Sequence, residues 1–293
     1  MTAAVATTHG SSHRMPGLWS LLASQVGYQL RLLSRTPRAM FGSILMPAIL
    51  LALRVGQVDR GSAGAAARTV PLVAGLAVLG LTSTAYVTYA SSLVSARQDG
   101  VLRRWRTTPL PAVGYFCGKM VAAVLLAEGA AAVVIAIGVA MTGTHLDVAA
   151  VPVLAAVIAV GALAFAALAT AVTVLIPTAE SAFPVLAVTF YPLVLLSGAF
   201  GSLSVEPAWL TTLLSYLPAQ PLVDAVTGAL RHSAGVPPLP GRSLLVLAGW
   251  GAVGLLAAVR FFRWEPTRPP HGRTDRRTGD RSAGGSADRP RSQ

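Results

Sequence analysis

Side chains that could perform catalysis are few in this sequence of 293 residues, and they do not converge. The long apolar segments contain one carboxylate, Glu128, and no histidine. The histidines fall in tails or loops, at His9, His13, His145, His232 and His271. There is no Gly-x-Ser-x-Gly nucleophile elbow and no aspartate-rich pair for a magnesium diphosphate. The sequence therefore predicts no catalytic residue and no metal site.

Glu128 stands near the middle of an apolar segment, where an ionised group is costly and usually faces a bundle interior or water. One interpretation is a proton site or a substrate contact. The other is a protonated or locally hydrogen-bonded carboxyl that fixes helix packing. No opposite charge occurs in another apolar segment, which favours the packing role.

A nucleotide-binding P-loop can also be excluded. That motif requires a lysine preceded by two spaced glycines and followed by serine or threonine. Lys119 is the only lysine, and it has Val113 in place of the first glycine and Met120 in place of the hydroxyl residue. Any ATP hydrolysis linked to this chain must therefore come from another subunit, and the chain itself is predicted to bind no cofactor.

Residues 97–111, Arg-Gln-Asp-Gly-Val-Leu-Arg-Arg-Trp-Arg-Thr-Thr-Pro-Leu-Pro, combine basic and apolar side chains. A helix here would place Val101, Leu102 and Trp105 together with arginines on its flanks, and Pro109 and Pro111 would end it. One interpretation is a basic loop at the lipid headgroups. The other is a short amphipathic helix that docks into the groove of a partner protein. Composition alone leaves both open.

Polar and aromatic residues also gather on two apolar segments. Thr82, Tyr86 and Tyr89 are spaced i, i+4 and i+7 and so share one helix face. Phe190 and Tyr191 lie in a second segment, between two prolines that are expected to kink it. Such faces can line a path for an amphipathic, ring-containing substrate, or they can be helix–helix packing surfaces.

The composition of the chain indicates which kind of protein must position these residues. Hydrophobic residues make up 54% of the chain and charged residues 12%, about half the usual charged share of a soluble domain. Between Met120 and Ala179 only Glu128 and Asp147 are charged. A soluble protein needs polar cover over its surface, so the pattern indicates a membrane protein and excludes a cytosolic enzyme, a secreted module and a disordered chain. No nucleic-acid-binding motif accompanies the net charge of +12, so no nucleic-acid partner is expected.

The predicted fold class is an all-α polytopic membrane protein. A span needs roughly 20 helical residues, and six candidates form a domain over residues 39–262: 39–55, 70–94, 113–141, 148–176, 182–202 and 243–262. An amphipathic helix over 16–38 is expected to lie in the membrane interface. Residues 203–241 are expected to form a re-entrant or extracytoplasmic helical hairpin. The tails, 1–15 and the basic 263–293, are predicted to be disordered.

Arginine placement predicts the orientation. Most of the 23 basic residues precede the first span, lie between the second and third spans, or come at and after the end of the sixth. Because cytoplasmic loops carry the excess of basic residues, both termini are predicted to be cytoplasmic in a multi-pass protein of the cell membrane, in contact with its lipids.

Together these features resemble a known family, the permease subunits of type-2 ABC exporters, and particularly the bacterial daunorubicin/doxorubicin-resistance permeases. The resemblance rests on the Arg35-Thr36-Pro37-Arg38 junction, Pro47 inside the first span, the glycine-to-proline stretch 100–110 and the proline-rich helices before the last span. It covers about residues 16–263.

The resemblance implies a mechanism. Two permease chains, here a homodimer, pair with two P-loop ATPase subunits, which use ATP and magnesium, and a drug-like or lipid substrate is exported. The helix after the second span becomes a coupling helix on the ATPase, formed here by Arg97, Asp99, Gly100, Leu102, Arg103, Arg104, Arg106 and Pro109. The second and fifth spans line the substrate route, which assigns to it Thr82, Tyr86, Tyr89, Phe190 and Tyr191.

Two alternatives from other classes stay open at this point. A proton-coupled secondary transporter would use Glu128 as its proton site. An intramembrane enzyme acting on lipids or isoprenoids is disfavoured by the missing acidic pairs.

Overall fold

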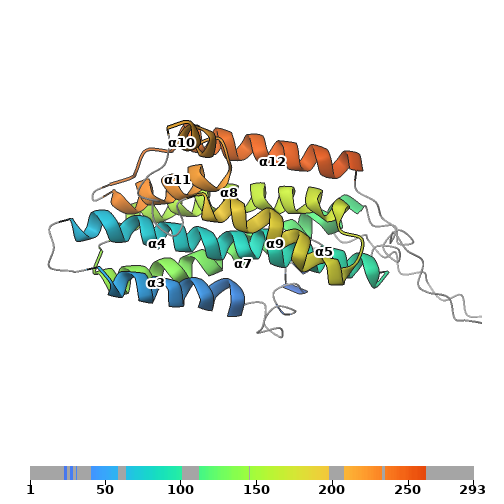
Figure 1. The fold of residues 1–293 in the computed structure, drawn as a ribbon, viewed down its shortest axis with the longest axis horizontal. Coiled ribbons are helices and arrows are strands. Elements are labelled where there is room, and N and C mark those ends of the chain that lie inside the picture. Colours follow the sequence, from blue (N-terminus) through green and yellow to red (C-terminus); the bar gives the residue numbers. More distant parts are fainter. Residues whose placement is uncertain are drawn as a thin grey trace, which may run out of the picture.

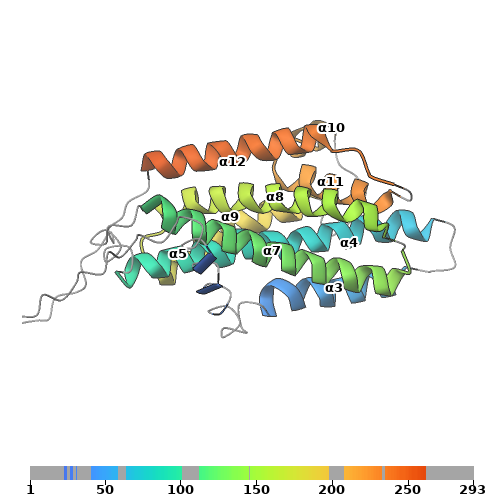
Figure 2. The same ribbon diagram turned by 180° about the vertical axis from the view of Figure 1, so that it is seen from behind.

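The computed structural model describes residues 23–24, 27–28, 31, 41–58, 64–100, 112–144, 146–197, 208–232 and 235–261. Within these residues every regular element is a helix, and the long helices run roughly side by side along the molecule (Figures 1 and 2). The predicted all-helical class is therefore confirmed for this part of the chain. Most of the predicted interfacial helix, the coupling helix after Gly100 and both tails lie outside it.

The first half of the bundle contains three long helical stretches. A π-helical turn η1 (Phe41–Leu45) leads into α3 (Met46–Gly56). The second stretch joins α4 (Ala65–Thr82), a π-helix η2 (Ser83–Thr88) and α5 (Tyr89–Gln98) without a break. The third is α7 (Ala112–Thr142). The second stretch is longer at both ends than the predicted span 70–94.

The second half begins with η3 (Val148–Ala150), α8 (Val151–Val172) and η4 (Thr173–Leu175). Then follow α9 (Ala179–Leu195), the short α10 (Ala208–Leu214), α11 (Ala219–Arg231) and α12 (Gly241–Phe261). Helix α9 starts earlier than the predicted span 182–202 because Thr178 and Ser181 form a capping box, in which each side chain bonds the other's backbone N–H.

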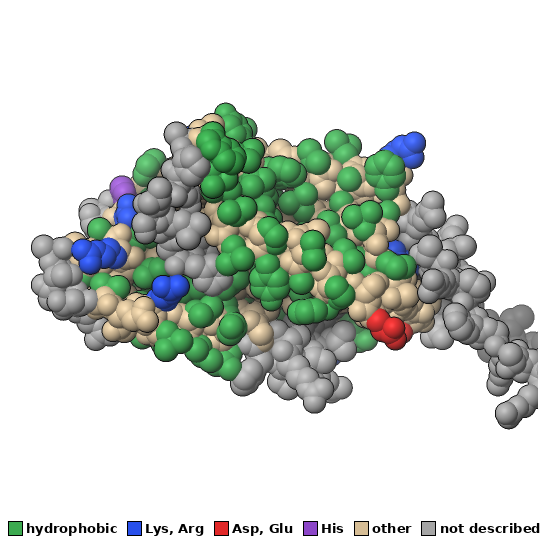
Figure 3. All heavy atoms as spheres, viewed as in Figure 1, with side chains coloured by type: hydrophobic (Ala, Val, Ile, Leu, Met, Phe, Trp, Pro, Cys, Tyr) green, Lys and Arg blue, Asp and Glu red, His purple; other side chains and the backbone are tan. Residues whose placement is uncertain are grey.

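Four of the helices are long and apolar enough to cross a membrane: Ala65–Gln98, Phe116–Thr142, Val148–Leu175 and Gly241–Phe261. Two shorter apolar helices, Gly42–Gly56 and Ala179–Leu195, coincide with the predicted first and fifth spans. Hydrophobic side chains spread over the middle of the visible surface, and basic ones lie toward its ends (Figure 3). The structure supports a multi-pass membrane protein, and the six-span topology stays a prediction.

Helix α4 lies at the centre of the bundle, with its residues from Val73 to Thr82 all buried. It packs against α3, α7 and α11, whereas α12 packs mainly along α8 on the opposite side (Figure 1). Gly254 allows that contact to be very close, because a Cβ there would come within 2.6 Å of the Leu168 backbone nitrogen. Small residues at such crossings let membrane helices pack through their backbones.

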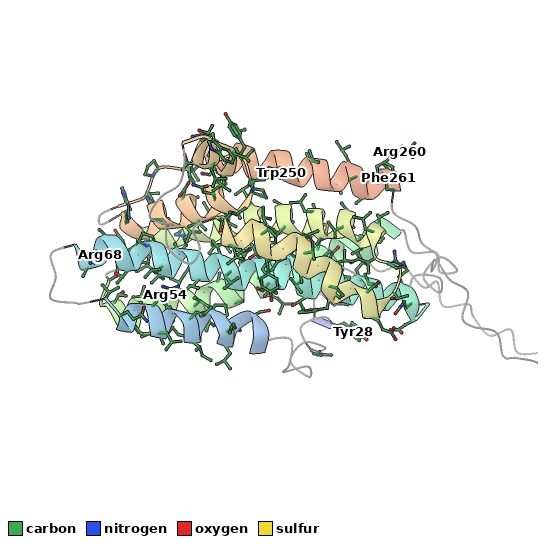
Figure 4. All side chains as sticks on the ribbon, viewed as in Figure 1. Tyr28, Arg54, Arg68, Trp250, Arg260 and Phe261 are labelled. Atoms are coloured by element: carbon green, nitrogen blue, oxygen red, sulfur yellow. The ribbon has the colours of Figure 1, made fainter. Side chains whose placement is uncertain are left out.

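The segment predicted as a hairpin contains α10 and α11, and α11 is strongly amphipathic. Its apolar face, including Leu222 and Val226, is buried against α4, α8 and α12. Arg231 at its end donates a hydrogen bond to the Ala67 carbonyl oxygen (3.2 Å). Helix α11 thus lies beside α4 near the end of the bundle that carries Arg54 and Arg68, and Arg260 lies at the other end (Figure 4). Whether the hairpin is re-entrant stays a prediction.

Asp147 links two connecting segments, the one before η3 and the one before α12. One carboxylate oxygen accepts a hydrogen bond from the Ala149 backbone N–H at 3.0 Å and so caps η3. The other accepts from the Gly235 N–H at 2.9 Å, in the segment that leads to α12. These bonds, and the nearby His232, hold the pKa of Asp147 below its ordinary value.

Candidate functional site

Arg97, in the last turn of α5, is buried inside the bundle. One guanidinium nitrogen, Nη1, donates to the Thr173 carbonyl oxygen at 3.2 Å, and Nη2 donates to the Ile176 carbonyl oxygen. Both carbonyls belong to the C-terminal end formed by η4 after α8, where backbone oxygens lack helical partners and carry partial negative charge. Arg97 therefore fastens α5 to the turn between α8 and α9.

Asp99 and Gly100 end the same helix. The Asp99 N–H donates to the Ser95 carbonyl oxygen at 2.9 Å, and Gly100 has φ of +69°, the left-handed conformation that stops a helix. This turn ends α5 just before residues 101–110, the rest of the predicted coupling helix. The other predicted coupling residues lie outside the described residues: Leu102, Arg103, Arg104, Arg106 and Pro109.

Lys119 lies in α7, the first described helix after the segment 101–111. Its side chain is 6% exposed, and Nζ donates to the Ser92 carbonyl oxygen of α5 at 3.2 Å. The sequence offered no sign of this contact, since Lys119 looked like one more basic residue near the headgroups. Arg97 before the segment 101–111 and Lys119 after it thus both bond to backbone carbonyl oxygens of neighbouring helical elements.

Tyr86, in the π-helix η2, joins three parts of the bundle. Its hydroxyl donates to Thr189 Oγ1 of α9 at 2.9 Å. Its ring stacks on Phe190 with centroids 6.0 Å apart and meets Phe165 of α8 edge-on at 6.5 Å. We call Tyr86, Phe165, Thr189 and Phe190 the aromatic cluster. Single-turn π-helices inside α-helices are often found at functional sites.

The remaining predicted path residues lie around this cluster. Tyr89 is buried and accepts a hydrogen bond from Thr170 Oγ1 of α8 at 3.2 Å. Thr82 is buried and bonds back to the Val78 carbonyl oxygen at 2.7 Å. Tyr191 is 50% exposed, with its ring 5.5 Å from that of Phe190. Within a single chain, four of the five predicted residues are thus packing contacts, and only Tyr191 faces outward.

A family model described as ABC-2 type transporter matches residues 18–230, well over half of the chain. No curated protein matches it. Within the described residues, no group of three or more histidine, cysteine, aspartate or glutamate side chains could hold a metal ion. The matched region includes Arg97, Gly100, Lys119 and the whole aromatic cluster. The chain belongs to the ABC-2 type transporter family and is the membrane component of an ABC transporter, a family whose permeases normally pair with an ATP-binding subunit.

Proposed function

We propose that this chain is the permease subunit of an ATP-driven exporter in the cell membrane, which moves a hydrophobic or amphipathic substrate out of the cytoplasm. Two copies would assemble with two P-loop ATPase subunits, and both termini would be cytoplasmic. Drug-like molecules and lipids are the proposed substrate classes. The observation that carries the proposal is the pair of anchors, Arg97 and Lys119, on either side of residues 101–111 in a chain of this family.

These anchors suggest how ATP could act on the bundle. We assign residues 101–110 to a coupling helix that binds the ATPase. A displacement of that helix would pull on Arg97, which is bonded to the turn between α8 and α9. Helix α9 starts directly after this turn and carries Thr189 and Phe190 against Tyr86. Movement at the ATPase would thus reach the aromatic cluster through continuous contacts.

The proposed cycle uses two states of the bundle. ATP binding brings the two ATPases together and shifts the coupling helices, which favours the outward-facing state, and hydrolysis restores the inward-facing state. Thr82, Tyr86, Tyr89, Phe190 and Tyr191 are the proposed residues of the substrate route. Because the first four are buried in one chain, this assignment requires that α9 separate from η2 during the cycle.

The test is reconstitution of the chain with its ATPase in proteoliposomes. We expect replacement of Gly100 or Leu102 by glutamate to leave both proteins in the membrane but to uncouple ATP turnover from transport. Wild-type transport by these variants would contradict the coupling assignment. Glu128→Gln distinguishes the secondary-transporter alternative, because it should abolish proton-coupled export of any substrate but leave ATP-driven export of an uncharged substrate largely intact.

A further inference from the structure

A cavity of about 660 Å³ lies between α7 and α8, away from the aromatic cluster. Its α7 wall includes Gly129, Ala132 and Ala136, and its α8 wall includes Ala155 and Ile158. The small α7 residues recur at helical spacing, which hollows one face of that helix. They and Ala155 are exposed, so the cavity opens on the outer surface of the bundle. We call it the α7–α8 groove.

Glu128 is the only ionisable residue among those that line the groove. It lies near the middle of α7, roughly 20 Å along the helix from either end. Helix α8 carries no charged residue, and no described residue pairs with the Glu128 carboxylate. On α7 the nearest basic residue is Lys119, which is bonded toward α5 instead. The groove therefore combines apolar walls with one carboxylate that lacks a partner in the described part of the chain.

This charge decides which ligand the groove suits. An unpaired carboxylate at membrane depth is costly, and a bound cation would remove that cost by pairing with it. A neutral lipid tail could cover the apolar walls but would leave the carboxylate unpaired. An anionic amphiphile would be repelled. The volume also falls within the range of small-molecule sites, about 300–1,000 Å³.

We propose that the α7–α8 groove binds a lipophilic cation from the membrane, with a single ammonium paired to Glu128 and an apolar body lying along Gly129, Ala132 and Ala136. This inference deepens the proposed function, because it places a membrane-facing site for cationic cargo on the transporter. The role of the groove in transport rests on the proposed function. Binding itself requires no ATPase. Failure to bind and failure of ATP-driven transport can therefore be told apart.

The test uses the full chain in phosphatidylcholine nanodiscs, with radiolabelled dodecyltrimethylammonium as the probe. We expect saturable binding above that of empty nanodiscs. Unlabelled probe should displace it, and dodecanol, which lacks the charge, should displace it at least about tenfold more weakly. Glu128→Gln should weaken binding by about tenfold or more. Glu180→Gln, at an exposed carboxyl that begins α9, is the matched control and should bind as the wild type does.

A second variant tests the apolar wall. A Cβ at Gly129 would meet nothing within 4 Å, so Gly129→Leu should fill the groove without disturbing the bundle. We expect it to weaken binding with Glu128 intact. Size-exclusion chromatography checks that the variant is folded. If Gly129→Leu aggregates, Ala132→Val is used in its place to fill the groove. Equal affinity in the wild type and Glu128→Gln, equal displacement by dodecanol, or no saturable binding would each overturn the proposal.

Discussion

The guanidinium of Arg97 lies 3.2 Å from the carbonyl oxygen of Thr173, although the two residues are 76 positions apart in the chain. This bond, with its companion to Ile176, joins the helix that precedes residues 101–110 to the turn that precedes α9. Arg97 was predicted from the sequence as a contact to a partner. Its burial and its bonds to Thr173 and Ile176 favour a role inside the chain, in which it would position the proposed coupling segment relative to α9.

Arg97→Ala should impair both stability and coupling. It leaves two buried carbonyl oxygens without their charged donor, which should lower the free energy of unfolding by about 2 kcal/mol. We expect substrate-stimulated ATP turnover of the reconstituted complex to fall while the ATPase still co-purifies. Arg97→Lys, which can keep one bond, should be intermediate. Arg260→Ala, at the exposed end of α12, is the control. Normal coupling in a folded Arg97→Ala protein would refute this role.

Gly100 should tolerate only residues that accept a left-handed backbone. A β-branched side chain at φ of +69° costs about 1–2 kcal/mol, whereas asparagine adopts this conformation more readily. Gly100→Val should therefore reduce coupled ATP turnover more than Gly100→Asn does. The reverse order, or two identical activities, would show that the turn after α5 does not depend on this conformation.

The bond between Tyr86 and Thr189 can be measured with a double-mutant cycle. Tyr86→Phe and Thr189→Val each remove it, and we expect a coupling of about 0.5–1.5 kcal/mol in the free energy of unfolding in detergent. Tyr89 bonds to Thr170 instead, so Tyr89→Phe combined with Thr189→Val should be additive. Additivity in the first pair would mean that the bond contributes nothing to the stability of the cluster.

Asp147 should give a pH-dependent contribution to stability. Its pKa is lowered in the folded state, chiefly by the hydrogen bond from the Ala149 N–H and then by that from Gly235. Its contribution is therefore complete above the unfolded pKa of about 3.9 and is lost as pH falls through the lower, folded value. We expect Asp147→Asn to lower the Tm near neutral pH. The difference from the wild type should shrink below about pH 3. A difference that is constant with pH would exclude this effect.

Two glycines of α12 provide a matched test of its packing on α8. A Cβ at Gly254 would meet the Ala167 and Leu168 backbone at 2.6–3.0 Å, whereas one at Gly249 would meet nothing within 4 Å. Gly254→Ala should lower the free energy of unfolding by about 1–3 kcal/mol, because backbone atoms cannot move aside easily. Gly249→Ala should be neutral or slightly stabilising. Equal effects of the two substitutions would contradict the close contact between α12 and α8.

Much of the fold could be predicted because long apolar runs in this chain have few folded alternatives. Backbone groups in lipid must be paired, so the runs become helices, and Gly100 follows the common pattern of a glycine after a helix end. The start of α9 was missed by three residues, although the Thr178–Ser181 capping box was a readable signal. The π-helix η2 had no such signal, since it depends on how Tyr86 packs against α8 and α9.

The candidate site was harder to predict, because its key contacts join residues distant in sequence. Helical spacing predicts that Thr82, Tyr86 and Tyr89 share one face. It does not predict the residues they bond to, such as Thr189 for Tyr86. Arg97 was assigned only to the coupling element, and Lys119 looked like an ordinary basic residue at the membrane surface. Their burial depends on which carbonyl oxygens the tertiary packing brings within reach, and hydropathy carries no such information.

The central claim is that residues 101–110 bind a separate ATPase and couple its ATP hydrolysis to transport. Crosslinking in living cells tests this claim most directly. Leu102 is replaced by a photo-crosslinking amino acid, and captured proteins are identified by mass spectrometry. Arg54, at the end of the bundle away from the C-terminus of α5, is the control position. We predict capture of a P-loop ATPase from position 102 and not from position 54. Absence of any nucleotide-hydrolysing protein at position 102, with export unchanged after deletion of the chain's ATPase, would contradict the account.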